Sequence, residues 1–226
     1  MNVAAIRTHL TAALALLDAP EVPASPTPAP AKAARICVDA GHGGHDPGAV
    51  AGVSKEKDLA LAYALELRNE LVRRGHHVIT TRTADVFVEL AQRAATANTA
   101  GADCFVSIHA NAADSKLANG AWVIHDDSAG AAGGVALAQR VFDRLAAVPG
   151  IADADAAREV FPDASPQVGG RQLAVLSQTK MPAILVELGF LTNEEDLGAL
   201  REASTRAKVV GAIADGVEDW LRGRPR

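Results

Sequence analysis

Two histidines of this sequence stand just past the ends of apolar runs. Residues 36–38 form a run that stops at Asp39 and leads into a Gly-rich turn with His42, and residues 104–108 lead directly to His109. Each histidine comes five residues after a cysteine of its run. If both runs are parallel strands in similar register, both imidazoles emerge at one sheet edge, where open α/β folds collect ligands. Imidazole is a common ligand of divalent transition metals, so this edge is a candidate metal site.

The Gly-rich turn, with the sequence GHGGHDPG, is compatible with three chemistries. A dinucleotide loop would need a third glycine where Asp46 stands. A phosphate loop would need a Gly-Lys-Ser/Thr ending, whereas Pro47 lacks an amide donor and Asp46 repels phosphate. The metal interpretation is therefore favoured, although the turn taken alone is equally consistent with His42 and His45 being exposed residues without a function.

Two glutamates complete the set of residues that could do chemistry. Glu187 lies in the apolar run of residues 182–190, and a carboxylate there is costly to bury without a metal, a cation or a proton. A functional role is favoured, with an ion pair to an arginine as the alternative. Glu56, taken alone, is typical of an acid near a helix N-terminus. Together with His42 and His109, however, it makes two imidazoles and one carboxylate, a set that leaves a fourth zinc position open.

The apolar periodicities indicate the elements that would position these residues. They predict an α/β fold: a single twisted, mostly parallel sheet flanked by helices. The candidate zinc site would lie at the carboxyl edge of the strands. Two helices are expected to begin at the capping residues Ser54 and Asp85. Two more are expected at residues 135–145 and 202–221, and strands at residues 36–38, 77–82, 104–109, 121–125 and 182–190. Residues 149–172 are expected to form an irregular loop that lines a substrate groove.

Composition divides the chain into four segments. Residues 1–19 have apolar residues at helical spacing and are expected to form a short amphipathic helix, with a weak signal peptide as the alternative. Residues 20–34 are a Pro/Ala-rich linker, residues 35–222 form the main domain, and residues 223–226 are a basic tail. No convincing signal peptide is recognised, so the localisation stays open.

Charge and cysteine content exclude several other classes. With a net charge of −5 and no basic stripe, the chain is not expected to bind nucleic acid. It has no apolar run of about 18 residues, so no membrane span is expected. Cys37 and Cys104 are expected to be buried thiols. A serine or cysteine hydrolase is disfavoured, because no G-x-S-x-G elbow is present and both cysteines lie inside strands.

Five motifs occur in a characteristic order along the chain. They are DAGHGGHDPGA, EKDLAL, a TR pair with Asp85 and Arg93 downstream, SIHANA, and PAILVELGFLTN. This order resembles the zinc-dependent N-acetylmuramoyl-L-alanine amidase family, which is represented by bacterial cell-separation amidases, spore-cortex amidases and many phage lysins. The resemblance runs from Arg35 to about Leu221 and does not extend to residues 1–34.

The resemblance implies a role for four residues. His42, Glu56 and His109 would bind one Zn²⁺ per chain, and Glu187 would be the catalytic glutamate. The reaction would be hydrolysis of the amide between N-acetylmuramic acid and the L-alanine of the peptidoglycan stem peptide. His45 stands at a variable position of the family turn, so no role is transferred to it. The interval of residues 149–171 is too short and irregular for the long helical insertion of family members that are held inactive.

Several alternatives stay open. A zinc peptidase of the stem peptide and a non-catalytic peptidoglycan-binding module are the competing functions. The sequence does not separate a phage-type lysin from a bacterial wall-remodelling enzyme, although the lack of a convincing signal peptide favours the lysin. The protein is expected to be a monomer. Affinity for the wall would come from the catalytic groove, from residues 1–34 or from a protein partner, and the sequence leaves these three alternatives open.

Overall fold

Six strands form one sheet in the order β4-β1-β5-β8-β6-β7. In the computed structural model these strands are β1 (Arg35–Ala40), β4 (His77–Thr80), β5 (Cys104–Asn111), β6 (Trp122–His125), β7 (Val160–Pro162) and β8 (Ala183–Phe190). Strands β4, β1, β5 and β8 are parallel, β6 runs antiparallel to β8, and β7 is parallel to β6. A separate two-stranded ladder joins β2 (Val50–Ala51) to β3 (Ser54–Lys55). The expected mostly parallel sheet is confirmed.

The structure describes residues 33–126, 133–151, 160–170 and 172–224, all within one unit that spans Ala31–Arg226. The expected N-terminal helix at residues 1–19 and nearly all of the linker at residues 20–34 lie outside the described residues. Ala34 is already buried, and its amide donates to Nδ1 of His76 at 3.3 Å. Within the described residues, no helix is both long enough and apolar enough to cross a membrane.

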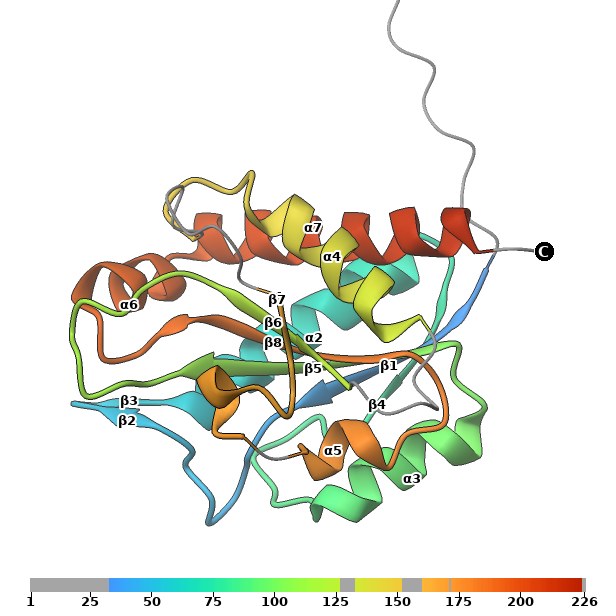
Figure 1. The fold of residues 1–226 in the computed structure, drawn as a ribbon, viewed down its shortest axis with the longest axis horizontal. Coiled ribbons are helices and arrows are strands. Elements are labelled where there is room, and N and C mark those ends of the chain that lie inside the picture. The colour runs from blue at the N-terminus through green and yellow to red at the C-terminus, as the bar shows by residue number, and fades with distance from the viewer. Residues whose placement is uncertain (1–32, 127–132, 152–159, 171, 225–226) are drawn as a thin grey trace, which may run out of the picture. The chain divides into compact units, whose positions relative to one another are not determined.

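Helices lie on both faces of the sheet (Figure 1). One face packs against α2 (Glu56–Arg73), α4 (Gly134–Leu145) and α7 (Ala203–Gly223), and this side contains the larger apolar core. The other face packs against the shorter helices α3 (Leu90–Ala100) and α5 (Ala174–Ser177) over a smaller core. The remaining elements are α6 (Glu194–Arg201) and the 3₁₀ turn η1 (Pro166–Val168). The central strands are buried on both sides because helices cover both faces, which explains their near-continuous apolar sequence.

Some local expectations need correction. Ile36 pairs with Cys104 and Ala40 pairs with Ile108, so the two histidine-bearing strands are offset by one residue, yet both end at the same edge. Helix α2 begins after Lys55 without a side-chain cap, so the expected cap at Ser54 is wrong. Helix α3 begins only at Leu90, so the cap expected at Asp85 is wrong as well.

Candidate metal centre

The first element of the site is the turn that follows β1. His42 stands in this turn with φ of 56°, the left-handed region that non-glycine residues rarely adopt. Its Nδ1 is 2.8 Å from Oδ2 of Asp46, and Oδ1 of Asp46 accepts from the amide of Gly48 at 3.0 Å. Asp46 therefore fixes the orientation of the ring and leaves Nε2 to face Glu56. Asp46 has no role that could be assigned from the sequence, because its contact with His42 depends on the three-dimensional path of the turn.

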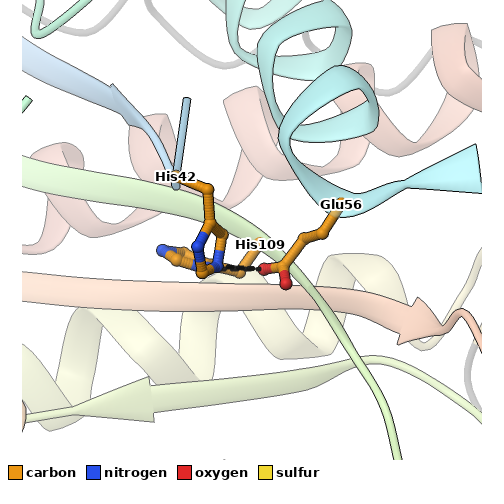
Figure 2. A group of neighbouring side chains, drawn as sticks. All are labelled: His42, Glu56 and His109. Atoms are coloured by element: carbon orange, nitrogen blue, oxygen red, sulfur yellow. Dashed lines mark hydrogen bonds and ion pairs between the residues drawn. The ribbon is translucent and has the colours of Figure 1, made fainter. Parts of the chain in front are cut away.

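The other two members come from α2 and β5. Glu56 is the first residue of α2, and its Oε1 lies 2.9 Å from Nε2 of His42 and 2.8 Å from Nδ1 of His109 (Figure 2). The amides of Ala49 and Ala110 also donate to this carboxylate, at 2.9 and 3.2 Å. One atom from each of the three side chains lies within 4.8 Å of the others. Ligands at about 2.0–2.2 Å from one Zn²⁺ are roughly 3–3.5 Å apart, so small rotations would fit this set to a zinc ion.

Two glycines allow the three side chains to come this close. A Cβ added to Gly41 would lie 2.3 Å from Cε1 of His109, so the histidine ring rests directly on the glycine backbone. A Cβ added to Gly48, which has φ of 64°, would lie 2.5 Å from Oε2 of Glu56. Any larger residue at these positions would displace one of the three side chains.

In the metal-free cluster, the carboxylate and the two imidazoles shift each other's pKa values toward the charged forms. Burial disfavours the charged form of Glu56, but hydrogen bonds from His109 and His42 outweigh this and hold the pKa of Glu56 well below its usual range. Burial alone would lower the pKa of His42, whereas the hydrogen bond and charge of Glu56, and then of Asp46, raise it to about 8. The pKa of His109 is also raised, mainly by Glu56 against the effect of burial. A metal ion that binds here must displace protons from the imidazoles, so its affinity falls as the pH falls.

Glu187 lies beside the three-residue cluster on the adjacent strand. It pairs in register with His109 across β5 and β8, and its Oε2 is buried without a hydrogen-bond partner among the described residues. Burial raises the pKa of Glu187 to about 7, against the lowering effect of the charge on His109. The alternative ion pair with an arginine is absent among the described residues. A buried carboxyl group with a free oxygen and a pKa near neutrality is suited to proton transfer.

Two hollows of about 410 Å³ each meet at this cluster, and both are lined by His42 and His109. The apolar hollow is walled mainly by residues of the α3 and α5 side, namely Phe87, Val88, Leu90, Leu173, Ala174, Val175 and Leu185. The mixed hollow adjoins the apolar one, because Leu173 and Leu185 line both, and it includes Asn111, Trp122, Gln167 and Glu187. Residues 149–172 were expected to form an irregular loop that lines a groove; the structure has β7 and η1 within this range, and η1 contributes Gln167 and Val168 to the wall. Two adjoining hollows therefore border the cluster.

The sequence names four site residues, and the structure brings all four together. His125, by contrast, is buried away from them, and its Nδ1 lies 3.0 Å from the carbonyl oxygen of Asp126. Cys37 and Cys104 are both buried free thiols, as expected. His76 is also buried.

Comparison with known proteins adds independent information. Residues 36–219 match the N-acetylmuramoyl-L-alanine amidase family. The amidase LytC of Bacillus subtilis is 34% identical over 187 residues, which cover 83% of this chain and 35% of LytC. The endolysin of Bacillus phage SPP1 is also 34% identical, over 82% of this chain and 65% of the endolysin. This chain thus spans only about a third of LytC, and 52% of AmiC from Neisseria meningitidis.

Solved structures agree with this match. The catalytic domain of CwlV, an amidase from Bacillus (Paenibacillus) polymyxa, superposes with a TM-score of 0.73 at 32% identity, over 84% of this chain and 99% of that domain. An amidase from Clostridium difficile 630 superposes with a TM-score of 0.76 at 30% identity, over 85% and 99% of the two chains. In sequence and in fold, this chain belongs to the N-acetylmuramoyl-L-alanine amidase family.

Proposed function

We propose that this protein is a zinc-dependent peptidoglycan hydrolase that cleaves the amide between N-acetylmuramic acid and the L-alanine of the stem peptide. The observation that carries the proposal is the meeting of His42, Glu56 and His109 within 4.8 Å, beside a buried carboxyl group. Two imidazoles and a carboxylate make up the donor set of many hydrolytic zinc sites. Membership of the amidase family supports the same reaction and the same substrate.

The three clustered residues would hold the zinc ion. When bound, Zn²⁺ supplies a Lewis acid that polarises a carbonyl oxygen and makes water a stronger acid. His42 would bind through Nε2, because Asp46 occupies its Nδ1, and His109 through Nδ1, which already faces Glu56. Glu56 would contribute Oε1, the atom that both imidazoles approach.

Glu187 would move the proton. Its Oε2, which has no hydrogen-bond partner among the described residues, accepts a proton from the attacking water, whose oxygen bonds to the carbonyl carbon of the amide. The carbon–nitrogen bond then breaks, and Glu187 passes the proton to the departing amine of L-alanine. A pKa of about 7 allows the same carboxyl group to act as base and then as acid near neutral pH.

The two hollows suit a substrate with two dissimilar halves. The scissile amide joins a glycan to a peptide, so chain must extend from the metal in both directions. The cluster borders both the apolar hollow and the adjoining mixed hollow with Trp122 and Gln167. This arrangement supports an enzyme that acts on a bond in the interior of its substrate.

The biological setting is a finer proposal. The match to a phage endolysin and the match to cell wall amidases support both a phage-type lysin and a bacterial wall-remodelling enzyme. We infer that the protein acts as a monomer and that residues 1–34 supply additional contact with the wall or with a protein partner.

The position of the cleaved bond tests the proposal. Purified sacculi are digested with the zinc-loaded protein, and the products are identified by mass spectrometry. We expect intact stem peptides with a free L-alanine amine, separated from the glycan, and no release after treatment with a chelator. Cuts inside the stem peptide would identify a peptidase instead. Binding to sacculi without any cleavage, with zinc supplied, would identify a non-catalytic wall-binding module.

A further inference from the structure

We propose that Arg82, Arg93 and Lys57 form a carbonyl clamp that positions His42 and thereby sets the affinity of the site for its metal ion. The clamp is defined by these three cations, which donate to the backbone carbonyls of the histidine-bearing turn. The inference rests on the proposed zinc site. It goes beyond that site, because it assigns the positioning of a ligand to three residues that would not touch the metal.

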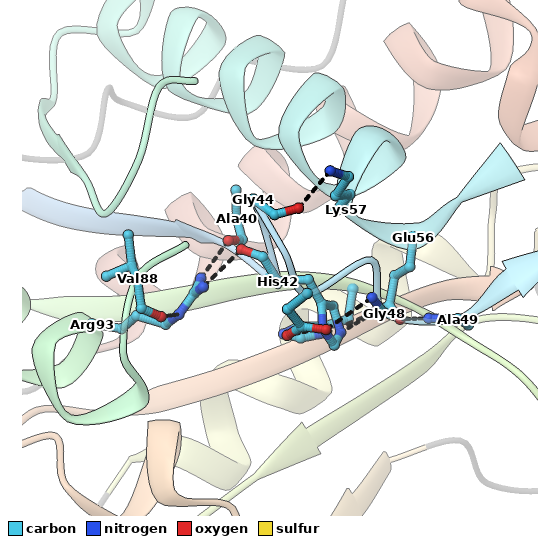
Figure 3. A network of polar contacts seen from close by, with 12 residues as sticks. Ala40, His42, Gly44, Gly48, Ala49, Glu56, Lys57, Val88 and Arg93 are labelled. Carbon is cyan, nitrogen blue, oxygen red and sulfur yellow. Dashed lines mark hydrogen bonds and ion pairs between the residues drawn. The ribbon is translucent and has the colours of Figure 1, made fainter. Parts of the chain in front are cut away.

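Every carbonyl of residues 40–44 accepts a hydrogen bond, and all but one of these bonds come from the clamp. Figure 3 shows two of the three donors: Arg93 bonds the backbone at Ala40 and His42, and Lys57 bonds Gly44. Arg82 donates through Nε to Ala40 at 2.9 Å and through Nη2 to Gly41 at 2.7 Å. Arg93 donates through Nη2 to the carbonyl of His42 at 2.8 Å and through Nη1 to that of Ala40. Lys57 donates to Gly44 at 2.8 Å. The exception is Gly43, whose carbonyl accepts from the amide of Asp46 at 3.1 Å.

Two acids hold the clamp itself in place. Asp39 is fully buried and accepts from Nη1 of Arg93 at 2.9 Å, while Ser107 donates to its other oxygen at 2.5 Å. Asp85 pairs with Lys57 at 2.7 Å and accepts from the amide of Gly44, also at 2.7 Å. The two arginines are 4% and 2% exposed, so their charge-assisted bonds are shielded from water.

The turn needs this support because of its backbone. His42 has φ of 56°, a strained conformation that persists only where the surroundings impose it. Asp46 orients the ring, but it lies in the same turn and moves with it. The clamp instead joins the turn to three segments outside it: Lys57 lies in α2, Arg93 in α3, and Arg82 just after β4. Each guanidinium group holds its donors in a planar fork of fixed geometry, which the ammonium group of a lysine does not reproduce.

Arg93 has a further contact that extends its effect to the substrate side. Its Nε donates at 2.9 Å to the carbonyl of Val88, which lines the apolar hollow. One guanidinium group therefore fixes both a candidate metal ligand and a wall of the adjacent hollow.

The variant Arg93→Lys keeps the charge beside Asp39 and removes the fork. The full-length protein is depleted of metal and titrated with Zn²⁺ against a chromophoric chelator. We expect the variant to bind Zn²⁺ about 10- to 100-fold more weakly than the parent protein. Its Co²⁺ complex should show a shifted visible absorption spectrum, because the ligand geometry changes. A merely structural arginine would alter neither quantity in a protein that remains folded.

Arg74→Lys is the matched control. Arg74 is also a largely buried arginine, and it bonds Glu70, Asp215 and Glu218 far from the turn. We expect this variant to lose thermal stability while Zn²⁺ affinity and the Co²⁺ spectrum stay those of the parent. Equal Zn²⁺ affinity and equal spectra for folded Arg93→Lys and the parent protein would overturn the inference.

If Arg93→Lys does not fold, a second pair of variants tests whether the clamp affects Zn²⁺ binding. Asp85→Asn loosens Lys57 and Gly44 from an exposed position, and Glu89→Gln removes a nearby exposed charge that has no side-chain contact with the turn. We expect weaker Zn²⁺ binding for Asp85→Asn than for Glu89→Gln, and equal binding by the two would overturn the inference. A parent protein that binds no Zn²⁺ would instead remove the proposed function itself.

Discussion

The turn that carries His42 and the strand that carries Glu187 differ in how their buried polar groups are hydrogen-bonded. In the turn, the carbonyls of residues 40–44 all have donors, and the buried Asp39 is paired with Arg93. In β8, Oε2 of Glu187 is buried without a hydrogen-bond partner among the described residues, and burial raises its pKa to about 7. The two regions meet where Glu187 pairs in register with His109.

This difference matches two different tasks. A group that holds a metal ligand must stay in place, and fully satisfied buried hydrogen bonds make a region rigid. A group that moves protons needs a free oxygen and a pKa near the working pH, and both follow from leaving a carboxyl group buried and unpaired. An unsatisfied buried oxygen costs free energy. We infer that this free-energy cost is retained at Glu187 because the unpaired oxygen is needed for proton transfer.

The largest expected effect comes from removing the exchangeable proton of Glu187. Glu187→Gln keeps the shape of the side chain, so Zn²⁺ affinity should stay close to that of the parent. Hydrolysis of sacculi should fall by about 10²- to 10⁴-fold, the usual contribution of a general acid–base group. The rate of amine release and a Zn²⁺ titration measure the two quantities. Turnover near the parent rate in the zinc-loaded variant would remove Glu187 from the mechanism. Glu194→Gln, which changes an exposed acid of α6 that lines neither hollow, controls for the lost charge.

A smaller effect is expected from a substitution at Gly41, in the turn that carries His42. In Gly41→Ala the new Cβ would lie 2.3 Å from the ring of His109, so the ring must shift. A displacement of about 1 Å at a reacting centre can lower the rate by about 10²-fold, and we expect hydrolysis and Zn²⁺ affinity to fall together. That joint loss distinguishes this variant from Glu187→Gln. Gly198→Ala is the control, because its Cβ would meet nothing within 4 Å. If Gly41→Ala kept its Zn²⁺ affinity, the close approach of the His109 ring to the backbone of Gly41 would not be needed for zinc binding.

The elements that carry the site are the part of the fold that the sequence predicts best. Parallel strands covered on both faces require a near-continuous apolar run, so β1, β5 and β8 are visible in the sequence, as are the residues at their ends. Helix α6 was missed, although Asn193, which accepts from the amides of Glu195 and Asp196, is a readable capping signal.

Arg82, Asp85 and Arg93 belong to one of the sequence motifs, but their binding partners are not visible in the sequence, for a physical reason. Arg82 and Arg93 bind backbone carbonyls, and every residue has a carbonyl, so no pattern of side chains marks the acceptor. The expected helix cap at Asp85 is wrong for a second reason. Its true partners, Lys57 and the amide of Gly44, are distant in the sequence and become neighbours only in the fold.

The smallest expected effect concerns stability and its dependence on pH. The pKa of Glu187 rises from an ordinary value of 4.5 to about 7 in the folded, metal-free protein. The folded state therefore binds this proton more tightly than the unfolded state does. This stabilisation is fully present below pH 4.5 and is lost as the pH rises through 7. Glutamine does not titrate, so Glu187→Gln should not lose this part of its stability between pH 5 and pH 8. Relative to the parent protein, the variant should therefore become more stable as the pH rises.

We expect the difference in free energy of unfolding between Glu187→Gln and the parent to grow by about 1–3 kcal/mol between these pH values. Urea unfolding of both chelator-treated proteins at pH 5 and pH 8 measures it. Bound Zn²⁺ should reduce the effect, because a nearby cation favours the ionised carboxylate. A difference that does not change with pH would mean that Glu187 is ionised in the folded protein, and the contrast with the fully paired turn would then disappear.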